Sequence, residues 1–106
     1  MKFYYDNVLL RTSKTRNYKY AVVINYEGHK HITWDKENGY YTKDVTEKAY
    51  EVIGCSETLE NAIKKADSEV SRRRNSLNKY PYPTKELNDL AYAQLKLIKV
   101  VELEQR

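Results

Sequence analysis

The most regular pattern in the chain is an alternation of side-chain types over residues 18–26. One face of this segment carries mainly aromatic and β-branched side chains, namely Tyr18, Tyr20, Val22, Ile24 and Tyr26. The other face carries Lys19, Ala21, Val23 and Asn25. A period of two with these residue types is typical of a β-strand, so we expect residues 18–26 to form one.

Turn signals indicate that more strands follow. A Glu-Gly pair at 27–28 predicts a tight turn, and the Asn-Gly pair at 38–39 is a strong signal for a β-hairpin. The further strands that we expect cover residues 29–35, 40–44 and 49–53, together with 2–5 and 7–12 near the N-terminus. Residues 45–50 are also compatible with a helical turn.

After Gly54 the apolar period changes from two to three or four residues, which predicts an amphipathic helix packed on a sheet. The apolar stripe consists of Leu59, Ala62, Ile63, Ala66 and Val70. Ser56 is expected to cap this helix, with Glu57 and Glu60 near the positive end of its dipole. The cations expected to close the helix at its negative end are Arg72, Arg73 and Arg74.

Residues 75–84 have the composition of a loop, with two prolines that each follow a tyrosine. Thr84 is expected to cap a second helix over residues 85–95. The apolar face of that helix consists of Leu87, Leu90, Ala91 and Leu95. We expect it to end near residue 97, before a last strand that Ile98, Val100 and Val101 favour. A helix that continues to residue 103 is the alternative.

These elements predict an α+β fold, in which a twisted antiparallel sheet of three to five strands carries two α-helices packed on one face. A chain of 106 residues usually makes one domain. The fold is therefore expected to span residues 1–106.

The aromatic composition indicates a recognition module. Tyrosine occurs 11 times, beside one Phe and one Trp. Phe and Leu are better suited to a core, because a buried phenol needs a hydrogen-bond partner. Tyrosine is favoured where a protein touches another macromolecule, since its ring is apolar and its hydroxyl polar.

Charge is distributed unevenly around a net value of +4. Residues 1–34 hold six Lys/Arg against two Asp/Glu, residues 35–70 hold five against nine, and residues 71–106 hold eight against four. The chain is thus basic at both ends and acidic in its middle. Such a distribution permits contact with phosphates through the ends or with a basic protein through the middle.

Several function classes find no support in the sequence. No Gly-rich phosphate loop, catalytic motif or paired metal-ligand cluster is present, so we expect no enzymatic activity and no cofactor. The lone Cys55 precludes an intrachain disulfide, and no long apolar run is present. We therefore expect a cytoplasmic protein of a bacterial host, without membrane contact. Monomer and homodimer are both open.

The main candidate site interleaves cations with aromatic rings around the expected loop. Its residues are Arg72, Arg73, Arg74, Lys79, Tyr80, Tyr82 and Lys85. A second group precedes the strand tyrosines and consists of Arg11, Lys14 and Arg16. Cations with flat rings suit phosphates and bases, and arginine also pairs with carboxylates at protein interfaces. The alternative is a solvated helix end with tyrosines folded back on the core.

Three smaller features have competing interpretations. Tyr18, Tyr20 and Tyr26 resemble a base-stacking platform, but Val22 and Ile24 share their face and favour core packing. His29, His31 and Asp35 could converge on a metal, yet no second ligand cluster accompanies them, so exposed histidines are the favoured interpretation. Cys55 precedes a helix N-terminus, which can lower a thiol pKa, but a small structural cysteine is expected there.

The run from Gly54 to Ala66, Gly-Cys-Ser-Glu-Thr-Leu-Glu-Asn-Ala-Ile-Lys-Lys-Ala, resembles the strand-to-helix junction of HicB-type antitoxins. In that family three strands lead into a helix that begins with a similar Thr-Leu-Glu-x-Ala run. The resemblance implies a βββα order. A terminal DNA-binding segment of the usual kind is not recognisable in this chain.

In overall character the chain is similar to small accessory proteins of bacteriophages and mobile elements, including anti-CRISPR and other anti-defence proteins. This similarity lies in the short, motif-free sequence rich in Tyr, Lys, Glu and Asn. It implies a non-enzymatic inhibitor that sterically blocks a nuclease or another nucleic-acid-handling protein complex. The alternative function is an antitoxin-type regulator that contacts DNA or RNA phosphates directly.

Overall fold

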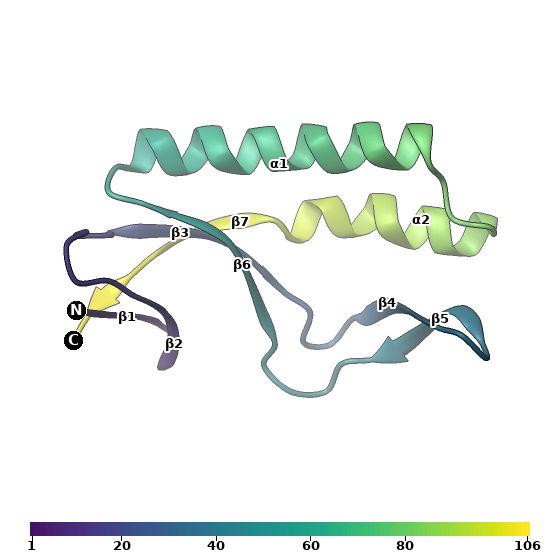
Figure 1. The fold of residues 1–106 in the computed structure, drawn as a ribbon, viewed down its shortest axis with the longest axis horizontal. Coiled ribbons are helices and arrows are strands. Elements are labelled where there is room, and N and C mark those ends of the chain that lie inside the picture. Colours follow the sequence, from purple (N-terminus) through teal and green to yellow (C-terminus); the bar gives the residue numbers. More distant parts are fainter.

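The computed structural model describes residues 1–106 and has mixed α and β structure (Figure 1). The strands are β1 (Lys2–Tyr5), β2 (Val8–Thr12), β3 (Tyr20–Asn25), β4 (Lys30–Asp35), β5 (Gly39–Asp44), β6 (Tyr50–Ser56), β7 (Lys99–Glu102) and β8 (Glu104–Gln105). The helices are α1 (Leu59–Lys79), α2 (Lys85–Gln94) and the short 3-10 helix η1 (Leu95–Leu97). The α+β class with antiparallel strands and two α-helices is therefore confirmed.

The strands divide into three small antiparallel sheets, with the orders β2-β1-β8, β6-β3-β7 and β4-β5. Helix α1 covers one face of the central β6-β3-β7 sheet. Helix α2 lies beside the second half of α1, and β4 and β5 lie on the other side of α2 (Figure 1). The two chain termini meet at the opposite end of a molecule that measures 43 × 27 × 22 Å.

Strand β3 forms the centre of the core because both of its faces are covered. Ala21 and Val23 pack with Cys55 and Val101 on the side of the β1–β2 hairpin, whereas the opposite face meets α1. All four residues from Ala21 to Ile24 are buried. Tyr18 lies before the strand and packs with the Ala21 face, so its predicted place beside Val22 and Ile24 was wrong.

A β-bulge bends β6 where it pairs with β3. Val22 pairs with Gly54 and Val23 pairs with Val52, which leaves Ile53 as the extra residue. A bulge of this kind bends its strand and redirects a side chain. It lies beneath the first half of α1, where Lys65 donates a hydrogen bond of 2.6 Å to the Cys55 carbonyl.

Helix α1 begins and ends later than the sequence pattern predicts. Its N-cap is Thr58, whose hydroxyl accepts from the Asn61 amide at 3.2 Å, while the predicted cap Ser56 is buried in β6. The three arginines do not close the helix, which continues through the first part of the predicted loop at 75–84 to Lys79. It ends there because a residue that precedes a proline, such as Tyr80, disfavours the helical conformation.

The buried face of α1 is also rotated from the predicted stripe. Leu59 and Ile63 are 47 % and 46 % exposed. The face that turns inward consists of Ala62, Ala66, Glu69, Val70, Arg73 and Leu77. Each of these positions lies three or four residues from another, so they form a continuous face that includes a charged pair.

The predictions for residues 84–102 are confirmed. Thr84 caps α2 and accepts a hydrogen bond from the Leu87 amide at 3.3 Å. Leu87 and Leu95 are buried. The chain then leaves η1 at residue 97 and pairs as β7 with β3, so the alternative of a helix to residue 103 was wrong.

The β4–β5 hairpin contributes no buried residue. Its turn is closed by Asp35, whose carboxylate accepts from the amides of Glu37 and Asn38 at 3.0 and 2.6 Å. Gly39 follows with a φ of 66°, a conformation in which glycine has no steric cost. Residues 45–49, which precede β6, contain no helical turn.

Candidate functional site

The structure divides the predicted basic and tyrosine-rich site between the two ends of the molecule. Lys14 and Arg16 follow β2, where Ser13 and Met1 exchange two main-chain hydrogen bonds at the terminal end. The connection between α1 and α2 lies at the other end of the long axis (Figure 1). Helix α1 alone spans about 30 Å between these ends, so one compact partner contact cannot include every predicted residue.

Arg73 points into the protein and is already paired. Its guanidinium donates to Glu69 and to Glu51, each at 2.7 Å, and the Glu51 carboxylate also accepts from the Tyr26 hydroxyl at 3.1 Å. Hydrogen bonds from Arg72, followed by those from Arg73, lower the pKa of Glu69 to about 2 although its partial burial opposes this. Arg73 therefore acts in a structural network that joins α1 to β6.

Arg72 and Arg74, the sequence neighbours of Arg73, lie on the exposed side of the helix. Arg72 is exposed and pairs with Glu69 on the preceding turn of α1. Arg74 is exposed and forms no ion pair. Hence the three consecutive arginines, which the sequence placed together, lie in three environments because successive helical residues point about 100° apart.

The remaining residues of the main predicted group do gather at one end. Lys79 lies 5.3 Å above the ring of the exposed Tyr80, and Tyr82 is half-buried. The Tyr82 ring packs edge-on against Tyr40 of β5 with 5.1 Å between centroids. Lys85 pairs with Asp89 at 2.7 Å on the exposed side of α2.

This end of the molecule exposes three large aromatic side chains, of which Tyr80 was predicted as a site residue and Trp34 and Tyr40 were not. Trp34 is 58 % exposed, Tyr40 is 47 % exposed and Tyr80 is 70 % exposed. Trp34 and Tyr40 are direct partners across β4 and β5, so they share one face of the hairpin. We call these three residues the distal patch. The Asn-Gly turn at 38–39 predicts a hairpin in which Trp34 and Tyr40 pair, so the sequence contained a signal for this part of the patch.

The strand tyrosines do not form an open stacking platform. Tyr18 packs edge-on against the buried Phe3 at 5.5 Å, and Tyr26 packs against His31 at 4.7 Å. Tyr20 is half-buried. Arg11 lies 5.7 Å from the Tyr18 ring, where it covers the core instead of reaching outward.

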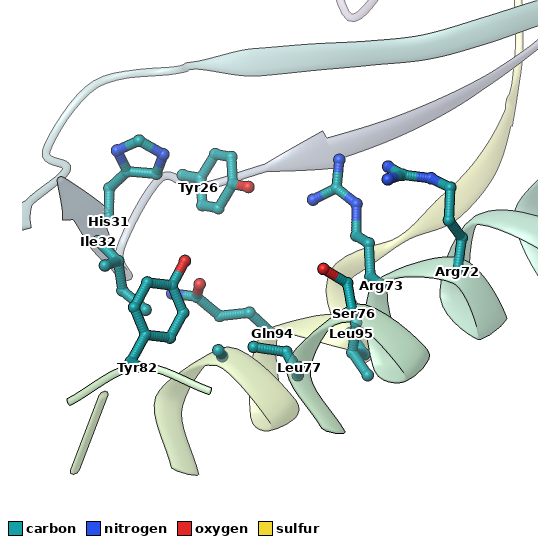
Figure 2. Close-up of a pocket in the computed structure, with 11 residues that line it drawn as sticks. Tyr26, His31, Ile32, Arg72, Arg73, Ser76, Leu77, Tyr82, Gln94 and Leu95 are labelled. Carbon is teal, nitrogen blue, oxygen red and sulfur yellow. The ribbon is translucent and has the colours of Figure 1, made fainter. Parts of the chain in front are cut away.

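A cleft of about 270 Å³ opens between α1, α2 and the start of the β4–β5 hairpin. Figure 2 shows Arg72 and Arg73 at one end, His31 and Tyr82 at the other, and Tyr26 between them. Its remaining walls come from Ile32, Ser76, Leu77, Ala91, Gln94 and Leu95. Burial, followed by the charge of Glu51, raises the pKa of Tyr26, so its hydroxyl stays protonated and can donate.

Asp35, His31 and Cys55, the side chains considered for metal or thiol chemistry, are each engaged in other contacts or buried. The Asp35 carboxylate is held by the hairpin turn, and its bonds to Asn38 lower its pKa. His31 packs on Tyr26, and the structure contains no cluster of three or more His, Cys, Asp or Glu side chains. Cys55 is buried in β6, and this burial raises its pKa.

Comparison with known protein families, with curated proteins and with solved structures finds no match to this chain. The similarity of residues 54–66 to HicB-type antitoxins thus stays a prediction. Neither helix combines the length and the apolar character needed to cross a lipid bilayer.

Proposed function

We propose that this protein is a non-enzymatic binding protein that docks on a protein partner through the distal patch. The observation that carries this proposal is the exposure of Trp34, Tyr40 and Tyr80 at one end of the molecule. Large rings left in water are costly, and Trp and Tyr are the residues most enriched at the energetic centres of protein interfaces.

The Tyr40 ring of the patch rests on a support that holds it in place. Tyr40 packs on Tyr82, and the Tyr82 main-chain amide donates to Asn88 of α2 at 2.8 Å. Asn88 in turn donates to the Tyr82 and Thr84 carbonyls, each at 2.9 Å. A ring that is fixed before binding loses little conformational entropy on docking.

The proposed partner is a nuclease or another nucleic-acid-handling complex, which the protein inhibits by steric occlusion. This choice of partner is supported by the similarity in overall character to anti-defence proteins of bacteriophages and mobile elements. Occlusion needs no reactive group in the inhibitor. It requires only a contact whose affinity exceeds that of the substrate for the same surface.

The test combines the double variant Trp34→Ala/Tyr80→Ala with the matched control Leu59→Ala/Ile63→Ala. The control removes two apolar side chains of similar exposure from the first turns of α1, away from the distal patch. Purified bacterial defence nuclease complexes are assayed one at a time for binding and for cleavage of their target.

We expect the wild type and the control to bind and inhibit a complex, with little loss between about 50 and 200 mM salt, because apolar contacts are weakly screened. The Trp34→Ala/Tyr80→Ala variant should lose at least about tenfold in affinity. If no complex is inhibited, or if this variant inhibits as well as the wild type, the proposal is wrong.

A further inference from the structure

A second surface, separate from the distal patch, runs along one flank of α1. A hollow of about 380 Å³ lies between α1 and β6. Its lining consists of Ile53, Gly54, Lys64, Lys65, Ser68, Glu69 and Arg72. Three of these side chains are cations, and Ser68 adds a hydrogen-bond donor. The only acid, Glu69, is 14 % exposed and pinned between two arginines.

Helical spacing extends this charge along the same flank. Along it lie Asn61, Lys64, Lys65, Ser68, Arg72, Asn75 and Lys79, each three or four residues from another member. Glu69 is an acid at the same spacing from Lys65 and Arg72, and it is already paired with two arginines. The rise per residue places Arg72 about 12 Å from Lys64 and Lys79 about 10 Å farther on. A row of cations at such intervals follows a chain of phosphates better than it follows a single anion.

The bulge in β6 and Gly54 give this flank its depth. Because Gly54 has no side chain, the Lys65 stem crosses the strand 3.5 Å from the position where a Cβ would lie. The Lys65 amine is tethered to the Cys55 carbonyl and keeps two further hydrogens for a ligand. The competing pair of Lys64 with Glu60 is largely exposed to water, at 70 % and 79 % of the two side chains, and is therefore weak.

The hollow and the cleft between the helices and the hairpin are neighbours, because Arg72 lines both. We call the two together the α1 trough. Its far part holds the aromatic rings of Tyr26, His31 and Tyr82 (Figure 2). A volume of 270 Å³ corresponds to about nine waters of ~30 Å³ each, which suits one planar ring system and little more.

From this arrangement we infer that the α1 trough binds single-stranded nucleic acid. Lys64, Lys65 and Arg72 would contact phosphates along the strand, and the cleft would receive one unstacked base among its aromatic residues. Single-strand sites in general combine a basic groove with flat side chains in this way. A duplex does not meet the geometry, because its bases are stacked and paired and none can enter the cleft.

The primary experiment measures fluorescence anisotropy of labelled single strands of about 12 nucleotides, as both DNA and RNA. The variant Lys64→Gln/Lys65→Gln removes two charges from the trough. The control Lys2→Gln/Lys96→Gln removes the same charge from exposed lysines that line neither hollow and form no ion pair. We expect the trough variant alone to bind about tenfold more weakly, with a log–log salt slope reduced by about 1.4.

Three competitor ligands complete the test. A strand of abasic sites should bind at least about fivefold more weakly than the matching base-containing strand, since one stacked base contributes about 1–3 kcal/mol. A duplex and a poly-glutamate peptide of equal charge should also bind more weakly. Equal binding of any of the three overturns the inference, as does equal binding of the Lys64→Gln/Lys65→Gln variant.

This inference and the proposed function fail independently. Trp34→Ala/Tyr80→Ala leaves every cation of the trough in place, so it should bind the single strand as the wild type does. Loss of oligonucleotide binding in that variant, with its circular dichroism spectrum unchanged, contradicts the assignment of the site to the trough.

Discussion

Tyrosine is used in opposite ways at the two ends of this molecule. At the terminal end, Tyr18 packs edge-on against Phe3, and Tyr5 packs edge-on against Tyr50 at 5.7 Å. At the distal end, Tyr40 and Tyr80 stay exposed, as does Trp34. The same residue type thus packs half-buried against other aromatic rings at one end and lies largely in water at the other.

The difference follows from the sheets present at each end. The terminal end has the β2-β1-β8 and β6-β3-β7 sheets together with α1, so Ala21 and Val22 on opposite faces of β3 are both buried. The distal end has the second half of α1, α2 and only one sheet, the two-stranded β4–β5 hairpin. A two-stranded hairpin has little apolar surface of its own to bury. Stability is therefore expected to concentrate at the terminal end and binding at the distal end.

The largest effect on stability is expected for Phe3→Ala. Phe3 lies in β1, the middle strand of the β2-β1-β8 sheet, and is fully buried. Phe-to-Ala changes in a core cost about 3–5 kcal/mol, which is a large part of the stability of a small domain. Urea unfolding followed by circular dichroism measures it, and Phe3→Leu offers a milder variant if the first does not fold. A loss below about 1 kcal/mol would contradict the placement of the core at this end.

Glu69→Gln tests the network that joins α1 to β6, because Glu69 holds Arg73 beside Glu51. Its pKa falls from an ordinary 4.5 to about 2 in the folded protein. A depressed carboxyl pKa stabilises the fold above pH 4.5, and this contribution disappears as the pH falls toward 2. At pH 7 we expect a loss of about 3 kcal/mol.

The pH dependence of the unfolding free energy provides a control for the Glu69→Gln prediction. Unfolding free energies of the wild type and Glu69→Gln should converge between pH 4.5 and about 2. A difference that stays constant over this range would show that the amide disturbs packing and that the ionised carboxylate is not what stabilises α1 on β6.

The two helix N-caps allow the stability of the two ends to be compared, since one cap lies at each end. Thr58 and Thr84 cap α1 and α2 with the same side-chain geometry. Replacing either by Ala should cost about 1 kcal/mol in urea unfolding if the protein unfolds as one unit. A smaller global effect for Thr84→Ala, with faster amide exchange confined to α2, would show that the distal end opens separately.

The smallest effect is expected for Trp34→Ala, which removes the largest side chain of the distal patch. Because more than half of that side chain is in water, the unfolding free energy should change by less than about 1 kcal/mol. Trp34 is also the single tryptophan, so wild-type emission should be red-shifted and readily quenched by acrylamide. A blue-shifted, protected emission would contradict the exposed patch.

The sequence predicted the elements best where the pattern was local. The alternation around β3, the Asn-Gly hairpin and the Thr84 cap each depend on a few neighbouring residues, and all three agree with the structure. The extent of α1 was misjudged because three arginines resemble a helix end, while Leu77 four residues beyond Arg73 still packs inward. Steps of three or four residues from Ala62 through Ala66 and Glu69 to Arg73 would have shown the charged pair on the buried face.

The sequence by itself determined the α+β class, the order of strands and helices, and the chemical inventory of tyrosines and cations, because short-range periodicity and composition encode these properties. Only the tertiary structure decided which of these side chains are available. It turned Arg73 inward, left Trp34 and Tyr80 in water, and brought Gly54 under Lys65. Such outcomes depend on contacts between residues far apart in the chain, and those contacts arise only when sheets and helices pack.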